Sequence, residues 1–372
     1  MLRRLELTDI KLLREVSLDP GRLNVVVGRN SVGKSTVLRA LDLIMSAERL
    51  RSEDPAPYPE GPTIAREAIT DQLEELQSKL PREGARIVLI DETGAETGLA
   101  LSKSSRALRW WWRDGADSRE LGGSDARLHW KAPNRVGSAL LLSLDARAIA
   151  AAHYSETDLP SVATDGGGTA SVLQYLQGLR DGQIEAIEAA LAQIVPGVRR
   201  IRALPARVSR RERLQITINS QDASTEQNRE VTGARFELEF DGLGWIPANH
   251  LSEGTLLSLG LLTALQWRPP SILLLDDLDK GLHPVAQRNL IQQLRNILDT
   301  QPGLQVLATS HSPFVLDELQ PEEVFVAGST APGVSHIRRL TEHPSWSKRS
   351  GYMQPGEFWS LVGEDWVAGD PP

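Results

Sequence analysis

The stretch LNVVVGRNSVGKSTVLRALDLI, residues 23–44, constrains the fold of this chain more than any other. Its β-branched run at 25–27 is typical of a buried strand, and apolar residues then repeat with helical spacing, at Val37, Leu38, Leu41 and Ile44. Between the two, Gly28 and Gly33 let the backbone curl so that successive N–H groups point inward, where they can bind phosphate oxygens. The stretch therefore predicts a strand, a phosphate-binding loop and a helix.

Two side chains of this loop suit a nucleotide and its metal ion. Lys34 can reach the β and γ phosphates, and the hydroxyl of Ser35 can hold Mg²⁺. A glycine-rich turn without a ligand would leave Lys34 unexplained. We therefore predict that a nucleotide binds along the whole loop, at Gly28, Arg29, Asn30, Ser31, Val32, Gly33, Lys34, Ser35 and Thr36.

A second motif, PPSILLLDDLDKGLHPVAQRNLIQQLRNIL, contains a short apolar run at 272–275, which predicts a central strand covered on both faces. Two carboxylates follow at the carboxyl end of that strand. We assign Asp276 to Mg²⁺, and Asp277 to orienting and deprotonating an attacking water. The alternative for Asp277 is a loop carboxylate without chemistry. Pro284 then predicts the first position of a helix.

A third motif, LQVLATSHSPFVLDEL, predicts another strand at 304–308 with His311 in the polar turn at its end. A histidine in a turn is often structural or solvated. Here it directly follows a core strand that comes after the acidic strand, which favours contact with a γ-phosphate and a catalytic role.

In the stretch LSEGTLLSLGLLTAL, the residues Ser-Glu-Gly-Thr precede a very apolar run that predicts a helix. Ser252 is a good helix N-cap, because its hydroxyl can accept a hydrogen bond from an unpaired backbone N–H group. A helix N-terminus with a hydroxyl and with Gly254, which has no Cβ, also suits a phosphate. The residues alone leave both interpretations open.

Together these motifs resemble the ATP-binding cassette (ABC) superfamily, and within it the soluble heads of the SMC, RecF and overcoming-lysogenization-defect (OLD) type. GRNSVGKST resembles Walker A, LSEGT the signature L-S-G-G-Q, ILLLDD Walker B, DKGLHP the D-loop and TSHSP the switch-histidine motif, in the order of the family. The resemblance implies an α/β P-loop head with a mixed sheet, an antiparallel β subdomain and a globular α+β insertion between Walker A and the signature. It also implies an ATPase that converts ATP to ADP and phosphate with Mg²⁺.

The resemblance further implies a homodimer in which each ATP is sandwiched between two subunits. Ser252 and Gly254 would then contact the γ-phosphate of an ATP held by the second subunit. Three residues depart from the family pattern: Glu253, Thr255 and Asp277 replace a glycine, a glutamine and the usual catalytic glutamate. Because aspartate is one methylene shorter, hydrolysis is expected to be slow or to require a closer approach of the subunits.

The order of the motifs divides the chain into four parts. Residues 1–50 and 246–345 form the two halves of the head, 51–245 the insertion and 346–372 a tail. The insertion begins with antiparallel strands, in ARIVLIDETG, ETGLALSKSS, RALRWWWRDG and ARLHWKAP. It continues with helices in TASVLQYLQGL and GQIEAIEAALAQIV and ends with strands in RLQITINS and RFELEFDG. The segment DGGGT, 165–169, predicts a flexible loop within the insertion.

Two features of the insertion suggest a partner. Trp110, Trp111 and Trp112 in a row point to both faces of a strand, so at least one lies outside the main core and forms a satellite core or stacks on bases. A basic run has arginine at 199, 200, 202, 207, 210, 211 and 213, which suits either a solvated strand edge or DNA phosphates. The net charge of −8 gives no overall attraction to nucleic acid.

The chain has no cysteine and no apolar run long enough to span a bilayer, which predicts a cytoplasmic protein without membrane association. In the tail, Glu357, Glu364 and Asp365 are too few and come too late to build a two-metal nuclease site. We therefore expect an ATPase that dimerises head to head on ATP and signals to a separately encoded effector, in antiviral defence or DNA repair. The alternatives are a RecF-like DNA clamp without an effector and an ATP-dependent scaffold that does not hydrolyse.

Overall fold

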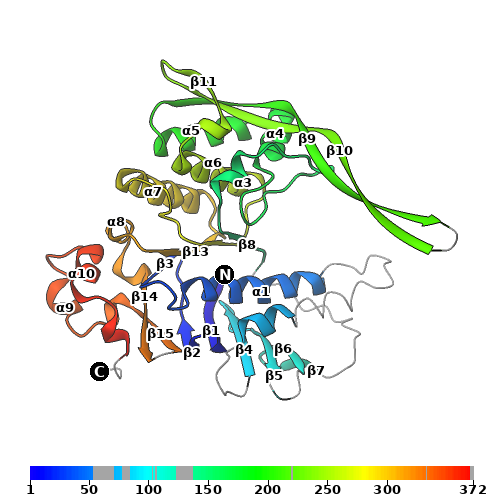
Figure 1. The fold of residues 1–372 in the computed structure, drawn as a ribbon. Helices are drawn as coiled ribbons and strands as arrows, with labels where there is room; N and C mark the ends of the chain where they lie inside the picture. The colour runs from blue at the N-terminus through cyan, green and yellow to red at the C-terminus, as the bar shows by residue number, and fades with distance from the viewer. Residues whose placement is uncertain are drawn as a thin grey trace. The chain divides into compact units, whose positions relative to one another are not determined.

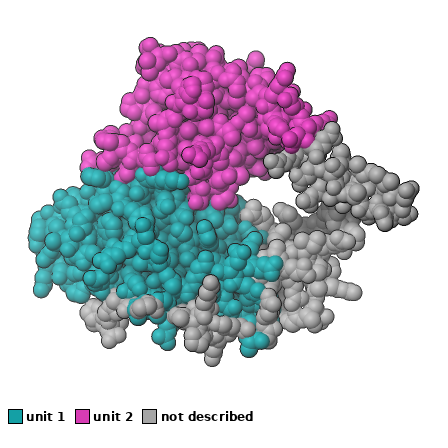
Figure 2. All heavy atoms as spheres, viewed as in Figure 1, with its two compact units in different colours: residues 1–141, 270–280, 294–372 teal, residues 142–269, 281–293 magenta. Residues whose placement is uncertain are grey.

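The computed structural model describes residues 1–52, 71–77, 84–102, 104, 107–122, 137–218, 221–331 and 333–368. The chain divides into two compact units (Figure 2). Unit 1 comprises Met1–Leu141, Pro270–Lys280 and Leu294–Pro372, and unit 2 comprises Leu142–Pro269 and Gly281–Gln293. Each unit is described by itself below.

Unit 1 is built on one mixed sheet of 12 strands (Figure 1). Across the sheet the order is β7 (Asp117–Gly122), β6 (Leu108–Asp114), β5 (Glu96–Ser102), β4 (Gly84–Asp91), β1 (Leu2–Ile10), β2 (Leu13–Leu18), β15 (Val334–Arg339), β14 (Val324–Ala331), β3 (Leu23–Val27), β13 (Gln305–Ser310), β12 (Ile272–Leu275) and β8 (Ala139–Leu142). Strands β14, β3, β13 and β12 run parallel to one another, whereas β1, β2 and β4 to β7 pair antiparallel. The predicted mixed sheet is confirmed.

Burial distinguishes the parallel strands of this sheet from the antiparallel ones, and β12 lies second from one edge rather than at the centre. Every residue of β3, β12 and β13 is buried, as expected of parallel strands covered on both faces. In β2, by contrast, exposed residues stand between the buried ones, as expected of a strand with one face toward solvent. Helix α1 (Lys34–Ser52) follows β3 directly, so the strand-loop-helix prediction holds.

The antiparallel strands of the insertion continue the same sheet. Strands β4, β5 and β6 confirm three of the predicted strands, whereas ARLHWKAP lies outside the described residues and β7 was not anticipated. Trp110 and Trp112 belong to the core of unit 1, and Trp111 packs on the other face against Gly98, with the Arg86 guanidinium 5.1 Å from its ring centre. All three tryptophans are buried, which supports a satellite core rather than a base-stacking surface.

Unit 2 combines helices with a three-stranded sheet, in the order β11 (Gly244–Pro247), β10 (Gln221–Phe240) and β9 (Val198–Ile218). Its helices are α3 (Ala146–Ala150), α4 (Thr169–Leu179), α5 (Gln183–Ile194) and α6 (Glu253–Trp267). Helix α6 contacts the other three and is buried from Gly254 to Leu265 without interruption, so it forms the core of this unit. Both predicted helices of the insertion are present as α4 and α5.

The segment 165–169 forms a tight turn in which Gly166, Gly168 and Thr169 are buried, while Asp165 is exposed. Gly166 and Gly168 adopt φ angles of 87° and 86°, and a Cβ on Gly168 would overlap the carbonyl oxygen of Ser161. The carboxylate of Asp165 accepts a hydrogen bond from the backbone of Gly167 at 2.9 Å. The glycines therefore serve a tight turn before α4, and the flexibility of this loop stays a prediction.

The remaining elements are short, apart from α7 (Pro284–Thr300), which begins at Pro284 as predicted and has residues in both units. They are α8 (Pro313–Leu316), α9 (Trp346–Arg349), α10 (Pro355–Val362), η1 (Ala248–His250), η2 (Pro321–Glu323), η3 (Leu340–Glu342) and η4 (Asp365–Ala368). Among the helices that the structure describes, none has the length and apolarity needed to cross a membrane.

Candidate functional site

The loop between β3 and α1 has the geometry of a phosphate cradle. Gly28, Ser31 and Gly33 have positive φ angles of 143°, 64° and 99°. A Cβ on Gly28 would overlap the carbonyl oxygen of Ala327 in β14, and a Cβ on Gly33 would lie 2.9 Å from Leu13. Both glycines are therefore required by the neighbouring strands as well as by the turn itself.

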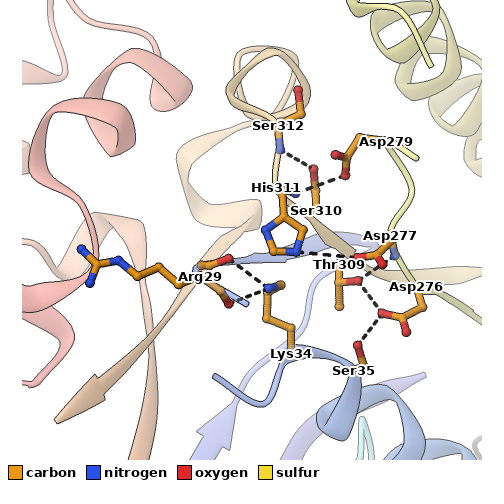
Figure 3. Close-up of polar contacts among 11 residues, drawn as sticks. Arg29, Lys34, Ser35, Asp276, Asp277, Asp279, Thr309, Ser310, His311 and Ser312 are labelled. Atoms are coloured by element: carbon orange, nitrogen blue, oxygen red, sulfur yellow. Dashed lines mark hydrogen bonds and ion pairs between the residues drawn. The ribbon is translucent and has the colours of Figure 1, made fainter. Parts of the chain in front are cut away.

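Lys34 closes this loop from inside (Figure 3). Its Nζ donates hydrogen bonds to the carbonyl oxygens of Gly28, at 2.9 Å, and Arg29, at 2.8 Å, and the residue is 6% exposed. Burial lowers the pKa of Lys34, against the opposing effect of Asp277 and Asp276. The amine is thus held where the loop curls, close to the two carboxylates of the second motif.

Asp276 and Ser35 lie together, although they are far apart in the sequence. Ser35 Oγ donates to Asp276 Oδ1 at 2.8 Å, and Thr309 Oγ1 donates to the same oxygen at 2.7 Å. A hydroxyl and a carboxylate are ligands that suit Mg²⁺. Within the described residues no cluster of three or more histidine, cysteine, aspartate or glutamate side chains could hold a metal alone. A magnesium ion here would therefore need phosphate oxygens and water to complete its shell.

Asp277 follows with its backbone in the left-handed region, at φ 53°. Its N–H donates to Thr309 Oγ1 at 2.8 Å, and its Oδ1 lies 3.8 Å from His311 Nε2. Burial, and next the neighbouring charge of Asp276, raise the pKa of Asp277, while His311 acts in the opposite direction. The backbone N–H of His311 is fixed by Asp279 Oδ1 at 3.1 Å. The predicted base and the predicted switch histidine thus face each other.

The other loop residues lie around this centre. Asn30 is exposed, whereas Val32 and Thr36 are buried. The side chain of Arg29 points away from Lys34 (Figure 3), and its Nε lies 3.2 Å from Glu364 Oε2. Glu364 is nearly buried, and no motif points to it.

The signature segment belongs to unit 2 and shows its capping geometry there. Ser252 Oγ accepts a hydrogen bond from the Thr255 backbone at 3.2 Å and lies 2.8 Å from Thr255 Oγ1. A Cβ on Gly254 would lie 2.8 Å from the carbonyl oxygen of Gly281, so the fold of this unit itself requires a glycine. Capping is therefore observed within the chain, and the role of Ser252 and Gly254 toward a second subunit stays a prediction.

The basic run lies on β9, where acidic partners accompany it. The arginines whose side chains are described pair with carboxylates, as Arg199–Asp241, Arg200–Glu239, Arg202–Glu237, Arg207–Glu230 and Arg210–Glu156. Most of these acids lie across the hairpin on β10. The side chains of Arg211 and Arg213 lie outside the described part of the structure. The pairing favours a solvated strand edge, and DNA binding stays a prediction.

Comparison with known proteins gives a family and a fold. Residues 23–317 match the family described as "AAA domain, putative AbiEii toxin, Type IV TA system". A curated relative, the OLD nuclease of Thermus scotoductus, is 42% identical over 45 residues, which is 12% of this chain and 8% of that protein.

Two solved structures have the same fold at 13% sequence identity. One is an Smc head bound to the C-winged helix domain of ScpA, with a TM-score of 0.55 over 91% of this chain and 96% of that one. The other is an Smc head with an extended coiled coil, bound to the C-terminal domain of ScpA from Pyrococcus furiosus, with a TM-score of 0.52 over 91% and 95%. The family match covers most of the chain, and the fold match agrees with it. The chain therefore belongs to this AAA domain family and has the mixed α/β fold of an ABC-type ATPase head.

Proposed function

We propose that this protein hydrolyses ATP to ADP and phosphate with Mg²⁺, dimerises head to head on ATP and passes its nucleotide state to a partner protein. One observation carries the proposal: within unit 1, Lys34, the Ser35–Asp276 pair and the Asp277–His311 pair converge although the chain separates them widely. Motifs that matched only by composition would have no reason to meet at one edge of a sheet.

Each residue then has a defined role. Lys34 exchanges its two carbonyl partners for phosphate oxygens when ATP enters the loop. Ser35 and Asp276 hold Mg²⁺, which neutralises charge that develops on the phosphates. Asp277 orients and deprotonates the attacking water, and its raised pKa makes it a better proton acceptor than an ordinary aspartate. His311, 3.8 Å from Asp277, orients that carboxylate and reaches toward the γ-phosphate.

The proposed homodimer and partner protein are inferred from the resemblance to ABC-type heads. The motif order supports a sandwich in which Ser252 and Gly254 of a second copy complete each ATP site. The Smc heads of this fold were solved bound to domains of ScpA, which supports a protein partner rather than a head that works alone. The short match to an OLD nuclease agrees with the resemblance of the motifs to OLD-type heads. On that resemblance we propose a role in antiviral defence rather than DNA repair, with the effector on another chain.

The test is phosphate release from ATP by the purified protein. Lys34→Ala should weaken ATP binding, and Asp276→Ala should remove the Mg²⁺ dependence of binding and turnover. Lys348→Ala and Asp299→Ala replace exposed residues of the same kinds and serve as matched controls. Hydrolysis at the wild-type rate by Lys34→Ala or Asp276→Ala would refute the site. A wild-type protein that binds ATP and dimerises but releases no phosphate would be a scaffold.

A further inference from the structure

Thr309 lies at the centre of the site, although no motif assigns it a role. It is fully buried on β13, which pairs parallel with β12 in a register that places Leu275 opposite Ala308. One residue further along both strands, Thr309 therefore lies beside Asp276 (Figure 3).

The Thr309 hydroxyl donates one hydrogen bond and accepts another, and its two partners are successive acidic residues. Because a carboxylate only accepts, Thr309 Oγ1 donates its proton to Asp276 Oδ1, at 2.7 Å. The same oxygen accepts the backbone N–H of Asp277, at 2.8 Å. The carbonyl oxygen of Thr309 accepts the N–H of Leu278, at 3.0 Å. One residue of β13 thus holds the Asp276 carboxylate and the backbone of Asp277 and Leu278, directly after β12.

These bonds have consequences for both carboxylates. At Asp276 the hydrogen bonds from Ser35 and Thr309 both reach Oδ1, so Oδ2 takes part in neither bond and would be the oxygen that serves a metal ion or its water. At Asp277 the bond to the N–H holds a backbone with φ 53°, a conformation that non-glycine residues rarely adopt. That conformation determines where the Asp277 carboxylate lies relative to His311.

We propose that Thr309 is a positioning residue, which sets the metal-binding carboxylate and the base at the same time. The inference rests on the proposed ATPase function and deepens it. Removing the hydroxyl while keeping the shape of the side chain should weaken metal binding and turnover and leave the lysine loop intact. A threonine that only fills the core would affect stability alone.

The experiment compares Thr309→Val, which removes the hydroxyl, with Thr309→Ser, which keeps it. Mn²⁺ binding in the presence of a non-hydrolysable ATP analogue is measured by electron paramagnetic resonance, and binding of fluorescent ATP is measured without metal. For Thr309→Val we expect Mn²⁺ affinity and turnover to fall by about 10-fold to 100-fold, as is usual for residues that orient a metal ligand. Metal-free ATP binding should stay within about two-fold. Thr309→Ser should behave as wild type.

Equal Mn²⁺ affinity in the valine and serine variants would overturn the proposal. If Thr309→Val does not fold, Thr309→Ala and Thr309→Ser form a second pair that differs by one oxygen atom, and the same comparison decides. The Mn²⁺ measurement does not require hydrolysis. A wild-type protein without turnover would therefore refute the proposed ATPase, while the effect of Thr309 on Mn²⁺ would still be decided separately.

Discussion

Asp277 has an environment that works against stability. Its φ of 53° is unfavourable for a residue with a Cβ, and its carboxylate lies beside Asp276. Because the pKa of Asp277 is raised, the folded protein binds this proton more tightly than the unfolded chain does. The free energy of unfolding therefore falls as pH rises from the ordinary value of 3.8 through the raised one. The Asp277 side chain is half exposed, so solvent screens its neighbours and the loss of stability at neutral pH is small.

Asp277→Asn should therefore separate function from stability. Asparagine has nearly the same shape, tolerates a positive φ and carries no charge, so the variant should melt at a higher temperature than wild type. It should still bind ATP but release no phosphate, because an amide cannot accept the proton. Thermal denaturation at pH 7.5 and phosphate release measure the two effects, with Asp158→Asn as an exposed control. Unchanged turnover would assign the base to another residue.

The pH dependence of turnover gives a second test at the same carboxylate. Since the raised pKa of Asp277 delays its ionisation, turnover should fall on acidification with a midpoint above the ordinary 3.8. His311 lowers the pKa of Asp277, so His311→Gln should move this midpoint to higher pH. Rates are measured between pH 4 and 9, with folding checked at each pH. A midpoint that stays in place in His311→Gln would show that the two side chains are not coupled.

The residues of the site differ in how far sequence alone can identify them. Lys34 and Asp276 stand in motifs where spacing and residue type together imply phosphate and metal chemistry. Thr309 carries no such signal, because its role depends on the register between β12 and β13, which a single sequence does not contain. The same holds for Glu364, whose contact with Arg29 joins segments at opposite ends of the chain.

At the level of elements, helix α6 contains a glycine whose missing side chain allows a neighbouring helix to pack closely. Gly260 lies in its middle, and a Cβ there would be 2.8 Å from Cδ1 and 3.1 Å from Cγ1 of Ile149, which is itself fully buried in α3. Gly178 lies within α4, is exposed and has nothing within 4 Å of such a Cβ. Both glycines have a helical backbone, but Gly260 is packed against a side chain and Gly178 faces open space.

Valine at the two sites should therefore have unequal effects. Gly260→Val should lower the free energy of unfolding by about 1–3 kcal/mol, because extra atoms in a packed core force side chains to shift. Gly178→Val should change it by less than about 0.5 kcal/mol, since valine is slightly better than glycine in a helix. Urea denaturation followed by circular dichroism measures both. Equal effects at the two sites would mean that Ile149 does not restrict α6.

The hairpin of β9 and β10 is an element whose length sequence patterns underestimate. The apolar pattern predicts strands only at 213–220 and 235–242, whereas the strands span 21 and 20 residues. Their continuous pairing includes contacts between opposite charges, such as Arg202 with Glu237 at 2.9 Å. Such pairs stabilise a ribbon without any alternation of apolar residues, so a hydrophobic pattern cannot reveal them.

At the scale of the whole molecule, motif order predicted the fold because three of the motifs, Walker A, Walker B and the switch-histidine motif, lie at the ends of β3, β12 and β13 of the large sheet. The full extent of the sheet could not be predicted from the sequence. β1 pairs with β2 on one side and β4 on the other, and this pairing joins the antiparallel strands to the parallel ones. Such a connection depends on contacts between distant segments, whereas the phosphate loop depends on neighbours in sequence.

The distribution of the motifs over the two units leads to a test of the dimer. Lys34 belongs to unit 1 and Ser252 to unit 2, and the observed hydrogen bonds give Ser252 only a capping role within its own chain. Ser252→Asp distinguishes the two roles, because aspartate is as good an N-cap as serine but repels a phosphate. If Ser252 only caps α6, this variant keeps the wild-type ATPase rate. If it contacts ATP across the dimer, the variant is inactive.

Mixing two inactive variants then shows whether the site is shared. In a dimer of one Lys34→Ala chain and one Ser252→Asp chain, one site collects both defects, while the other combines an intact Lys34 with an intact Ser252. With equal amounts, half of the dimers are mixed and each has one intact site, so up to about a quarter of the wild-type rate should return. Differently tagged chains verify the exchange. Mixed dimers without recovered activity would rule out independent shared sites, and an ATP-bound protein that stays monomeric in light scattering would rule out the sandwich itself.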